Sequence, residues 1–269
     1  MNATAHPSVR VKMRYAAADK PAGIFYALSH GESTCSFEEH ETEVVNARGL
    51  LDSFSLETNG AILHKHQSDV RDFTDEKEIN EVYVPEVKKL VQTLTGATRV
   101  IVFHKVGRFE QGEKEGKRQP AANAHIDYTE ESFRIWAKQE LGDGPDAEKL
   151  LGKRWAAINV WRGIKAVERM PLAFVDGRTI DPEKLRHVPI HDRPGVPTPL
   201  VGMNLLHDPA QRWYYVPDMQ PDEVLVFTLF DSDANRTQRV AHSAINDPTS
   251  RPDAAPRSSF EVRTIAFFD

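Results

Sequence analysis

A histidine and an aspartate separated by one apolar residue, His125-Ile126-Asp127, constrain this chain more than any other feature. Residues i and i+2 of a strand point to the same face, so His125 and Asp127 can reach one metal ion while Ile126 packs on the other side. Two ligands do not complete a metal site. The fold must therefore bring a third ligand to this strand from another part of the sequence.

His242 is the third ligand that we expect. It lies in a second segment with apolar flanks, which include Val240 and Ile245. Two neutral imidazoles and one carboxylate, with other coordination positions open, are the ligand set of non-haem Fe(II) oxygenases. The sequence therefore predicts that His125, Asp127 and His242 bind the metal and form the catalytic centre.

Other histidines compete with this assignment. His64-Lys65-His66 is a second closely spaced pair, but its flanks offer no third ligand at a recognisable spacing, so we expect a structural or surface role. His187, His191 and His207 lie in or just beyond a stretch rich in proline, aspartate and glycine, and we expect none of them to bind metal.

The periodicity of the chain predicts a mainly β protein with added helices. Residues 98–106, 154–162 and 260–268 are typical of buried strands, and Val87, Leu90, Val91 and Leu94 have the spacing of a helix that packs on the β core. We expect an irregular connection over 176–199. Residues 213–216 and 224–230 are expected to form a hairpin-like unit.

Composition restricts the classes of partner. A net charge of −6 with interspersed signs gives no electrostatic footprint for nucleic acid, and no run of 18 apolar residues predicts a membrane span. A single cysteine, Cys35, suits a reducing compartment. We therefore expect a cytoplasmic protein that binds a small molecule and neither nucleic acid nor membrane.

The chain resembles the hydroxylase/desaturase family of the AsaB/CmcJ type, which includes the gibberellin desaturase of fungi. The matching segments run in order along the chain: 118–129, 159–162, 171–173, 212–219, 221–224, 230–232, 241–244 and 256–263. The resemblance implies a double-stranded β-helix (a jelly-roll, cupin-like core), Fe(II), 2-oxoglutarate as co-substrate and O2. We expect one domain over 1–269, in which residues 98–269 form this core and residues 1–97 add strands and helices that pack on it.

The resemblance also implies which residues hold 2-oxoglutarate. An arginine one strand beyond the distal histidine binds the far carboxylate in such oxygenases, because a guanidinium matches a carboxylate in bidentate geometry. Arg257 is our first choice, with Ser259 as a second donor, and Arg263 is its rival. Asn159 on a buried strand either ties the sheet together or offers its amide to the co-substrate.

The implied function is oxidation of an unactivated C–H bond of a small natural-product or amino-acid-like substrate, by hydroxylation, desaturation or ring closure. Two alternatives remain open at this point. One is a cupin-like metal hydrolase or isomerase, since such folds support several chemistries. The other is a catalytically silent accessory or binding protein of a biosynthetic pathway. The oligomeric state is left open.

Overall fold

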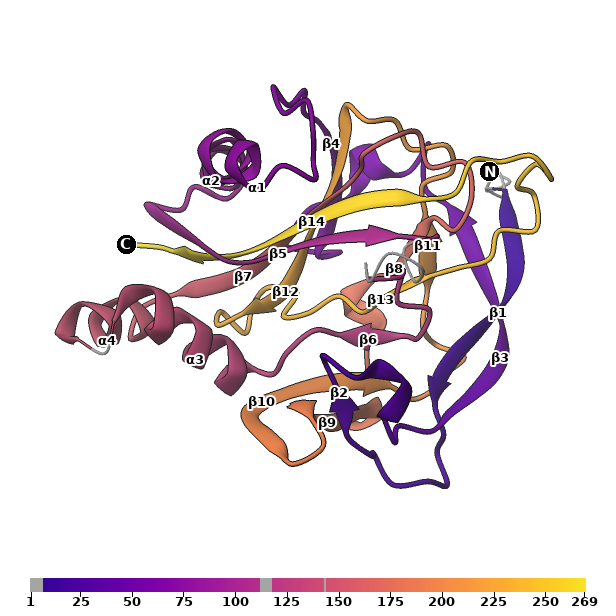
Figure 1. Cartoon of the computed structure of the whole chain (residues 1–269), viewed down its shortest axis with the longest axis horizontal. Coiled ribbons are helices and arrows are strands. Elements are labelled where there is room, and N and C mark those ends of the chain that lie inside the picture. Colours follow the sequence, from indigo (N-terminus) through magenta and orange to yellow (C-terminus); the bar gives the residue numbers. More distant parts are fainter. Residues whose placement is uncertain (1–6, 112–117, 143) are drawn as a thin grey trace.

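Two β-sheets packed face to face form the core of the computed structural model, which describes residues 7–111, 118–142 and 144–269 (Figure 1). The larger sheet contains, from edge to edge, β1 (Ser8–Ala16), β3 (Phe37–Asn46), β11 (Trp213–Tyr215), β8 (Leu172–Val175), β13 (His242–Ala244), β6 (His125–Ile126), β10 (Val196–Leu205), β9 (Leu185–Arg193) and β2 (Phe25–Tyr26). The smaller sheet contains β4 (Ala61–Lys65), β12 (Glu223–Asp231), β7 (Trp155–Gly163), β14 (Ser258–Phe267) and β5 (Arg99–Phe109). This arrangement confirms the predicted jelly-roll core.

Strand β14 shows how the sequence builds this sandwich. Phe260 and Val262 belong to the apolar cluster on the outer face of the smaller sheet, whereas Ile265 belongs to the cluster between the two sheets. Residues of alternate parity therefore face opposite sides, as expected for a strand that is buried on both faces. Glu261 and Arg263 alternate with the outward residues, so their side chains point to the same face as Ile265, between the two sheets. Arg263 pairs across the sheet with Asn159 of β7.

One helix covers the outer face of the smaller sheet. Helix α2 (Val84–Thr95) has a proline in its first turn and ends at Gly96, whose φ of 74° is the left-handed conformation that glycine adopts most readily. Its buried residues Val87, Leu90 and Val91 join the outer cluster, which confirms the packing that we predicted. The other helical segments are α1 (Glu76–Glu78), α3 (Glu130–Leu141), α4 (Pro145–Leu151), a π-helical turn at Ile79–Tyr83, and short 3-10 turns at His30–Glu32, Leu51–Ser53, Gly177–Thr179 and Pro182–Lys184.

Helix α3 contributes to the core between the sheets. The sequence predicts a short helix over 130–141 that ends at Gly142, and α3 occupies these residues. Its N-cap is Thr129, whose side chain accepts from the backbone N–H of Ser132. Phe133 is fully buried and contacts the aromatic rings of Phe103, Tyr128 and Phe230. The helix therefore packs directly beside the segment that carries Asp127.

The first 97 residues supply strands to both sheets. β1 pairs with β3 and β2 pairs with β9 in the larger sheet, whereas β4 pairs with β12 in the smaller sheet. The division of a single domain at residue 97 stays a prediction.

Two expectations about local structure are wrong. Residues 176–199 contain β9 and the first part of β10, which form an antiparallel hairpin, so this stretch is not an irregular loop. β11 and β12 do not form a hairpin either, because β11 pairs with β3 and β8 in the larger sheet while β12 pairs with β4 and β7 in the smaller one. The chain crosses between the sheets at the turn that joins them.

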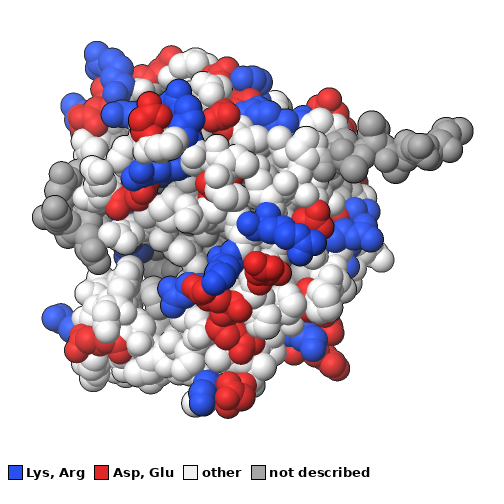
Figure 2. All heavy atoms as spheres, turned by 90° about the vertical axis from the view of Figure 1, so that its right-hand side faces the viewer, with Lys and Arg blue, Asp and Glu red and all other residues white. Residues whose placement is uncertain are grey.

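The charged surface is mixed. On the face shown in Figure 2, Lys and Arg side chains lie among Asp and Glu side chains rather than in separate regions. Among the residues described, no helix has the length and apolar character needed to cross a bilayer.

Candidate metal and co-substrate site

The three predicted metal ligands meet on the larger sheet. His125 of β6 and His242 of β13 are direct partners across the antiparallel pair, and their ring centroids lie 4.4 Å apart. Asp127 follows β6 immediately; its Oδ1 lies 3.8 Å from His125 Nε2 and its Oδ2 lies 3.9 Å from His242 Nε2. One ligand atom from each residue falls within 4.8 Å of the other two. Strand pairing thus brings together ligands from distant parts of the sequence.

A backbone carbonyl orients the first imidazole. Nδ1 of His125 lies 2.8 Å from the carbonyl oxygen of Asn123. A neutral ring that donates its Nδ1–H to this oxygen presents a lone pair on Nε2, the atom that faces Asp127. Such a second hydrogen bond is what commonly fixes the tautomer of a metal-binding histidine.

The electrostatics of the site suit a cation. Burial lowers the pKa of His125, and it lowers the pKa of His242 well below its usual value, so both rings are neutral ligands at neutral pH. Oδ2 of Asp127 is buried and has no hydrogen-bond partner among the residues described. A buried carboxylate oxygen without a partner is costly, and a metal ion at this position would remove that cost. Two nitrogen ligands and one carboxylate fit Fe(II).

Buried neutral histidines make the metal-free protein sensitive to acid. Burial, followed by the charge of Arg263, lowers the pKa of His104 on β5 to about 3. The unfolded chain takes up a proton below pH 6.5 whereas folded His104 stays neutral, so stability falls as the pH decreases. This histidine alone is expected to lower the free energy of unfolding by about 2 kcal/mol between pH 7 and pH 5. Urea unfolding at both pH values, compared with His104→Asn, measures it; an unchanged pH dependence in the variant would contradict the assignment.

The smaller sheet places Arg257 at the start of β14. Its guanidinium donates from Nη1 to the carbonyl oxygen of Met170 at 2.7 Å and from Nε to Ser259 Oγ at 3.2 Å, and it lies over the ring of Trp161. Met170 has a positive φ of 49°, an unfavourable conformation that turns its carbonyl to Arg257.

No carboxylate forms an ion pair with Arg257 among the residues described. Burial, followed by the nearby charge of Arg108, lowers the pKa of Arg257 to about 9. A buried guanidinium without an anionic partner is unfavourable, because its desolvation is not offset. Binding of a carboxylate would offset it, which is the role predicted for this residue.

Arg263 differs from Arg257 because its anionic partners are already present. Its Nη2 lies 2.7 Å from Asp127 Oδ1 and 2.7 Å from Glu261 Oε1. Burial opposes the charge of Arg263, but these two carboxylates raise its pKa above the usual value. Between the two candidates for the co-substrate anchor, Arg257 is thus the one with a free charge.

Asn159 faces the site from β7. Its neighbours across the smaller sheet are Arg263 on β14 and Phe227 on β12, and the ring of Phe227 lies 4.9 Å from that of His242. Both polar atoms of the Asn159 amide are buried without a hydrogen-bond partner among the described residues. The amide therefore does not tie the sheet together in this structure, and it is free to meet a ligand.

Sequence reasoning missed two residues that surround the site. His104 lies beside Arg263, with Nδ1 2.9 Å from Nη1, and Arg108 contacts Glu261 at 3.3 Å. His104 lies opposite Arg263 in the antiparallel register of β5 and β14, and a register shift follows directly after this pair. Such an irregularity has no clear signal in a sequence, although the charge alternation on β14 could have suggested that Arg263 and Glu261 need buried partners.

The competing histidines lie elsewhere. The Nδ1 and carbonyl oxygen of His66 contact Arg162 Nη2, and His207 stacks on His40 with ring centroids 4.0 Å apart. His187 and His191 lie on β9, paired with β10. Among the residues described, His125, Asp127 and His242 form the only group of three or more His, Cys, Asp or Glu residues that could hold a metal ion.

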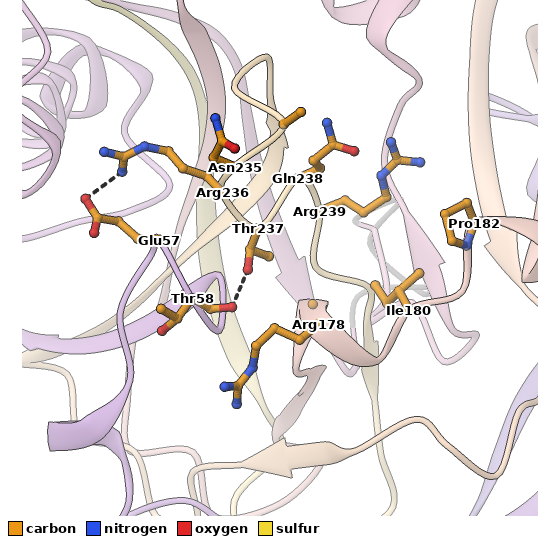
Figure 3. Close-up of a pocket in the computed structure, with 12 residues that line it drawn as sticks. Glu57, Thr58, Arg178, Ile180, Pro182, Asn235, Arg236, Thr237, Gln238 and Arg239 are labelled. Carbon is orange, nitrogen blue, oxygen red and sulfur yellow. Dashed lines mark hydrogen bonds and ion pairs between the residues drawn. The ribbon is translucent and has the colours of Figure 1, made fainter.

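A surface hollow of about 430 Å³ lies beside the connection between β12 and β13 (Figure 3). Arg236, Arg239 and Arg178 line it, but none of the predicted metal ligands does. Arg236 is paired with Glu57 at 2.7 Å and Arg178 with Asp176 at 2.5 Å. The hollow is therefore separate from the cluster of His125, Asp127 and His242.

Comparisons with known proteins identify similar chains. A family model described as an oxidoreductase/YMDC permease-like domain matches residues 13–267. The Fe(II)/2-oxoglutarate-dependent dioxygenase nvfI of Aspergillus novofumigatus is 32% identical over 254 residues, which cover 88% of this chain and 87% of the relative. The hydroxylase/desaturase CTB9 of Cercospora beticola is 30% identical over 87% of this chain and 78% of its own length. The solved structure of the iron and alpha-ketoglutarate-dependent endoperoxidase NvfI matches with a TM-score of 0.86 at 29% identity, over 97% of this chain and 98% of that one.

Proposed function

Because this chain belongs to the hydroxylase/desaturase family of Fe(II)/2-oxoglutarate-dependent dioxygenases, we propose that His125, Asp127 and His242 hold Fe(II) and that Arg257 holds 2-oxoglutarate. The observation that carries the proposal is the convergence of two neutral imidazoles on a buried carboxylate whose Oδ2 has no partner among the described residues. The donor set matches the facial triad of non-haem iron oxygenases.

The residues that we propose for binding 2-oxoglutarate belong to the smaller sheet. Arg257 would bind the distal carboxylate of 2-oxoglutarate, because its buried charge lacks a carboxylate partner among the described residues. Ser259 orients Arg257 through the contact at Nε, and it is the second donor that we propose for the same carboxylate. Asn159, with both amide atoms unpaired, is positioned to offer a hydrogen bond nearer the metal ligands.

Fe(II), 2-oxoglutarate and O2 together supply the oxidising power that removes hydrogen from an unactivated C–H bond. The chain's own contribution is to hold the reactants in place and to keep water out. His242 is 3% exposed and Asp127 is 8% exposed, and the ring of Phe227 covers His242 from the opposite sheet. Protein therefore shields these two ligands from bulk water.

We propose a small natural-product or amino-acid-like molecule as the substrate, in secondary metabolism. The names of the relatives include a dioxygenase, hydroxylase/desaturases and an endoperoxidase, so one family carries out several outcomes of oxidation. For this chain we propose hydroxylation, desaturation or ring closure at a C–H bond held beside the metal.

The alternatives fit the site less well. A cupin-like hydrolase or isomerase has no use for a buried arginine that lacks an ion pair. No carboxylate pairs with the Arg257 guanidinium among the described residues, and the nearby charges of Glu261 and Glu110 do not offset the effect of burial on its pKa. An accessory protein that has lost turnover has no need of neutral ligands with a free carboxylate oxygen. Both features favour an active oxygenase.

The test is consumption of 2-oxoglutarate by the purified full-length chain. With Fe(II), ascorbate and O2, we expect succinate to form even without the natural substrate, and a screen of candidate substrates should accelerate its formation. Zn(II) in place of Fe(II) should give none. Metal that binds stoichiometrically without any succinate formation would contradict the proposal and favour the hydrolase or accessory alternatives.

Replacing Asn159 with leucine should stabilise the cofactor-free protein and weaken its binding of 2-oxoglutarate. The substitution removes two buried polar atoms without partners, so the cofactor-free protein should become more stable, with a higher Tm. If the amide contacts 2-oxoglutarate, the Kd for 2-oxoglutarate should rise about tenfold. Calorimetric titration and thermal unfolding measure both, with metal affinity as the internal control. A lower Tm with unchanged 2-oxoglutarate binding would show that Asn159 is structural.

A further inference from the structure

A buried chain of ion pairs runs along the inner face of β14 to the carboxylate of Asp127. Arg263 Nη2 contacts Asp127 Oδ1 and Glu261 Oε1, each at 2.7 Å. Arg108 in turn contacts Glu261 Oε1 from Nε and Nη2, both at 3.3 Å. Asp127, Glu261 and Arg263 are each less than 10% exposed, so none of these charges is screened by solvent.

The two oxygens of Asp127 are treated differently. Oδ1 is held by Arg263, whereas Oδ2 is buried, has no hydrogen-bond partner among the described residues, and lies 3.9 Å from His242 Nε2. A carboxylate with one oxygen fixed by a guanidinium cannot rotate freely about its last bond. The contact therefore leaves Oδ2 as the oxygen that is free for another ligand.

Arg263 is itself held from several sides. Glu261 binds the same Nη2 that contacts Asp127, and His104 Nδ1 lies 2.9 Å from Nη1. His104 is neutral, because burial and Arg263 itself depress its pKa, so its Nδ1 can accept a hydrogen bond. A planar guanidinium can contact all three groups at once, which a single ammonium group cannot do with the same geometry.

The ion pairs of this cluster alternate in charge. Two arginines, Arg108 and Arg263, face two carboxylates, Glu261 and Asp127. Arg263 without Glu261 would withdraw electron density from Asp127 and weaken it as a ligand. Sharing the guanidinium between two carboxylates limits that effect while it keeps Asp127 in place.

We propose that Arg263 is a positioning residue for Asp127. It fixes Oδ1, which lies 3.8 Å from His125 Nε2, and so leaves Oδ2, 3.9 Å from His242 Nε2, free to bind the metal. Glu261 and His104 hold the guanidinium in that orientation. The proposal rests on the proposed function, in which Asp127 is a ligand of Fe(II). It gives Arg263 a role distinct from that of the co-substrate anchor Arg257.

Metal affinity tests the proposal without turnover. Co(II), whose visible absorption reports coordination, is titrated into the full-length chain and into Arg263→Gln, Arg263→Lys and Arg162→Lys. We expect the affinity to fall about 10- to 100-fold in Arg263→Gln and by less in Arg263→Lys, which keeps the buried charge. At saturating Co(II), the Kd for 2-oxoglutarate should stay within about threefold of wild type in both variants.

Arg162→Lys is the matched control. Arg162 is as buried as Arg263, but its side chain contacts His66 and lies over the ring of Tyr83, away from the metal ligands. Its substitution should lower the Tm while it leaves Co(II) affinity unchanged. This comparison separates loss of a buried arginine from loss of the contact with Asp127.

The outcomes are distinguishable. Co(II) affinity equal to wild type in folded Arg263→Gln would overturn the proposal. If Arg263→Gln fails to fold, Co(II) affinity equal to wild type in Arg263→Lys would overturn it. Normal metal affinity combined with lost 2-oxoglutarate binding in the Arg263 variants would also overturn it, because Arg263 would then be the anchor. Failure of the wild-type chain to bind Co(II) would refute the proposed function itself.

Discussion

Asp127→Ala is expected to lose bound iron and succinate formation together. The substitution removes one of three ligands and leaves Arg263 with a single carboxylate partner, so metal affinity should fall beyond the roughly 10- to 100-fold that loss of an outer contact causes. His125→Ala should have the same consequence, because the imidazole oriented by the carbonyl of Asn123 disappears. Iron content after anaerobic reconstitution and 2-oxoglutarate-dependent succinate formation measure the effect.

Matched variants make this result specific. Asp231 is a buried carboxylate on β12 paired with Arg154 at 2.7 Å, so Asp231→Ala reproduces the loss of a buried ion pair away from the metal ligands. His66→Ala and His207→Ala remove histidines that the structure places outside the cluster. All three should retain iron. Turnover that persists in Asp127→Ala would refute the ligand assignment.

Arg257→Met should abolish tight binding of 2-oxoglutarate while Fe(II) still binds. Truncating one partner of a buried, hydrogen-bonded charge pair costs roughly 2–5 kcal/mol, which corresponds to about a 30-fold or larger rise in Kd. The cofactor-free variant should be at least as stable as wild type, because the buried guanidinium has no anionic partner among the residues described. Calorimetric titration of the metal-loaded protein and thermal unfolding give both quantities.

Arg162→Met is the control for this second prediction. It also removes a buried guanidinium from the smaller sheet, yet it should leave 2-oxoglutarate affinity as in wild type. If Arg257→Met binds 2-oxoglutarate normally, the distal carboxylate is held elsewhere and Arg257 is a structural residue.

Local periodicity predicted the elements that position the site. His125 and Asp127 at i and i+2 required one strand and its immediate continuation, and the alternation along β14 placed Glu261, Arg263 and Ile265 on one face. Helix α3 occupies the predicted residues because a threonine N-cap and a following Gly142 mark its ends. These features depend on residues that are close in the sequence, so they can be predicted from the sequence alone.

Long-range pairing could not be predicted in the same way. Strand segments alternate in polarity whether they pair with a sequence neighbour or with a distant strand, so β11 and β12 seemed to form a hairpin although they lie in different sheets. The prolines at 189 and 197 suggested an irregular loop, but Pro189 and Pro197 lie in β9 and β10 near the edge of the larger sheet. His104 reaches Arg263 through the pairing of β5 with β14, two strands that are distant in the sequence. Each of these depends on tertiary context.

The most direct test of the account is an anaerobic titration of the purified chain with Fe(II) and then 2-oxoglutarate, followed by visible absorption. Chelation of Fe(II) by 2-oxoglutarate gives a weak charge-transfer band, which we expect in the wild-type protein and in Arg162→Met but not in Arg257→Met at the same 2-oxoglutarate concentration. Its absence from wild-type protein that has bound iron stoichiometrically would contradict the assignment of this chain as a 2-oxoglutarate-dependent oxygenase.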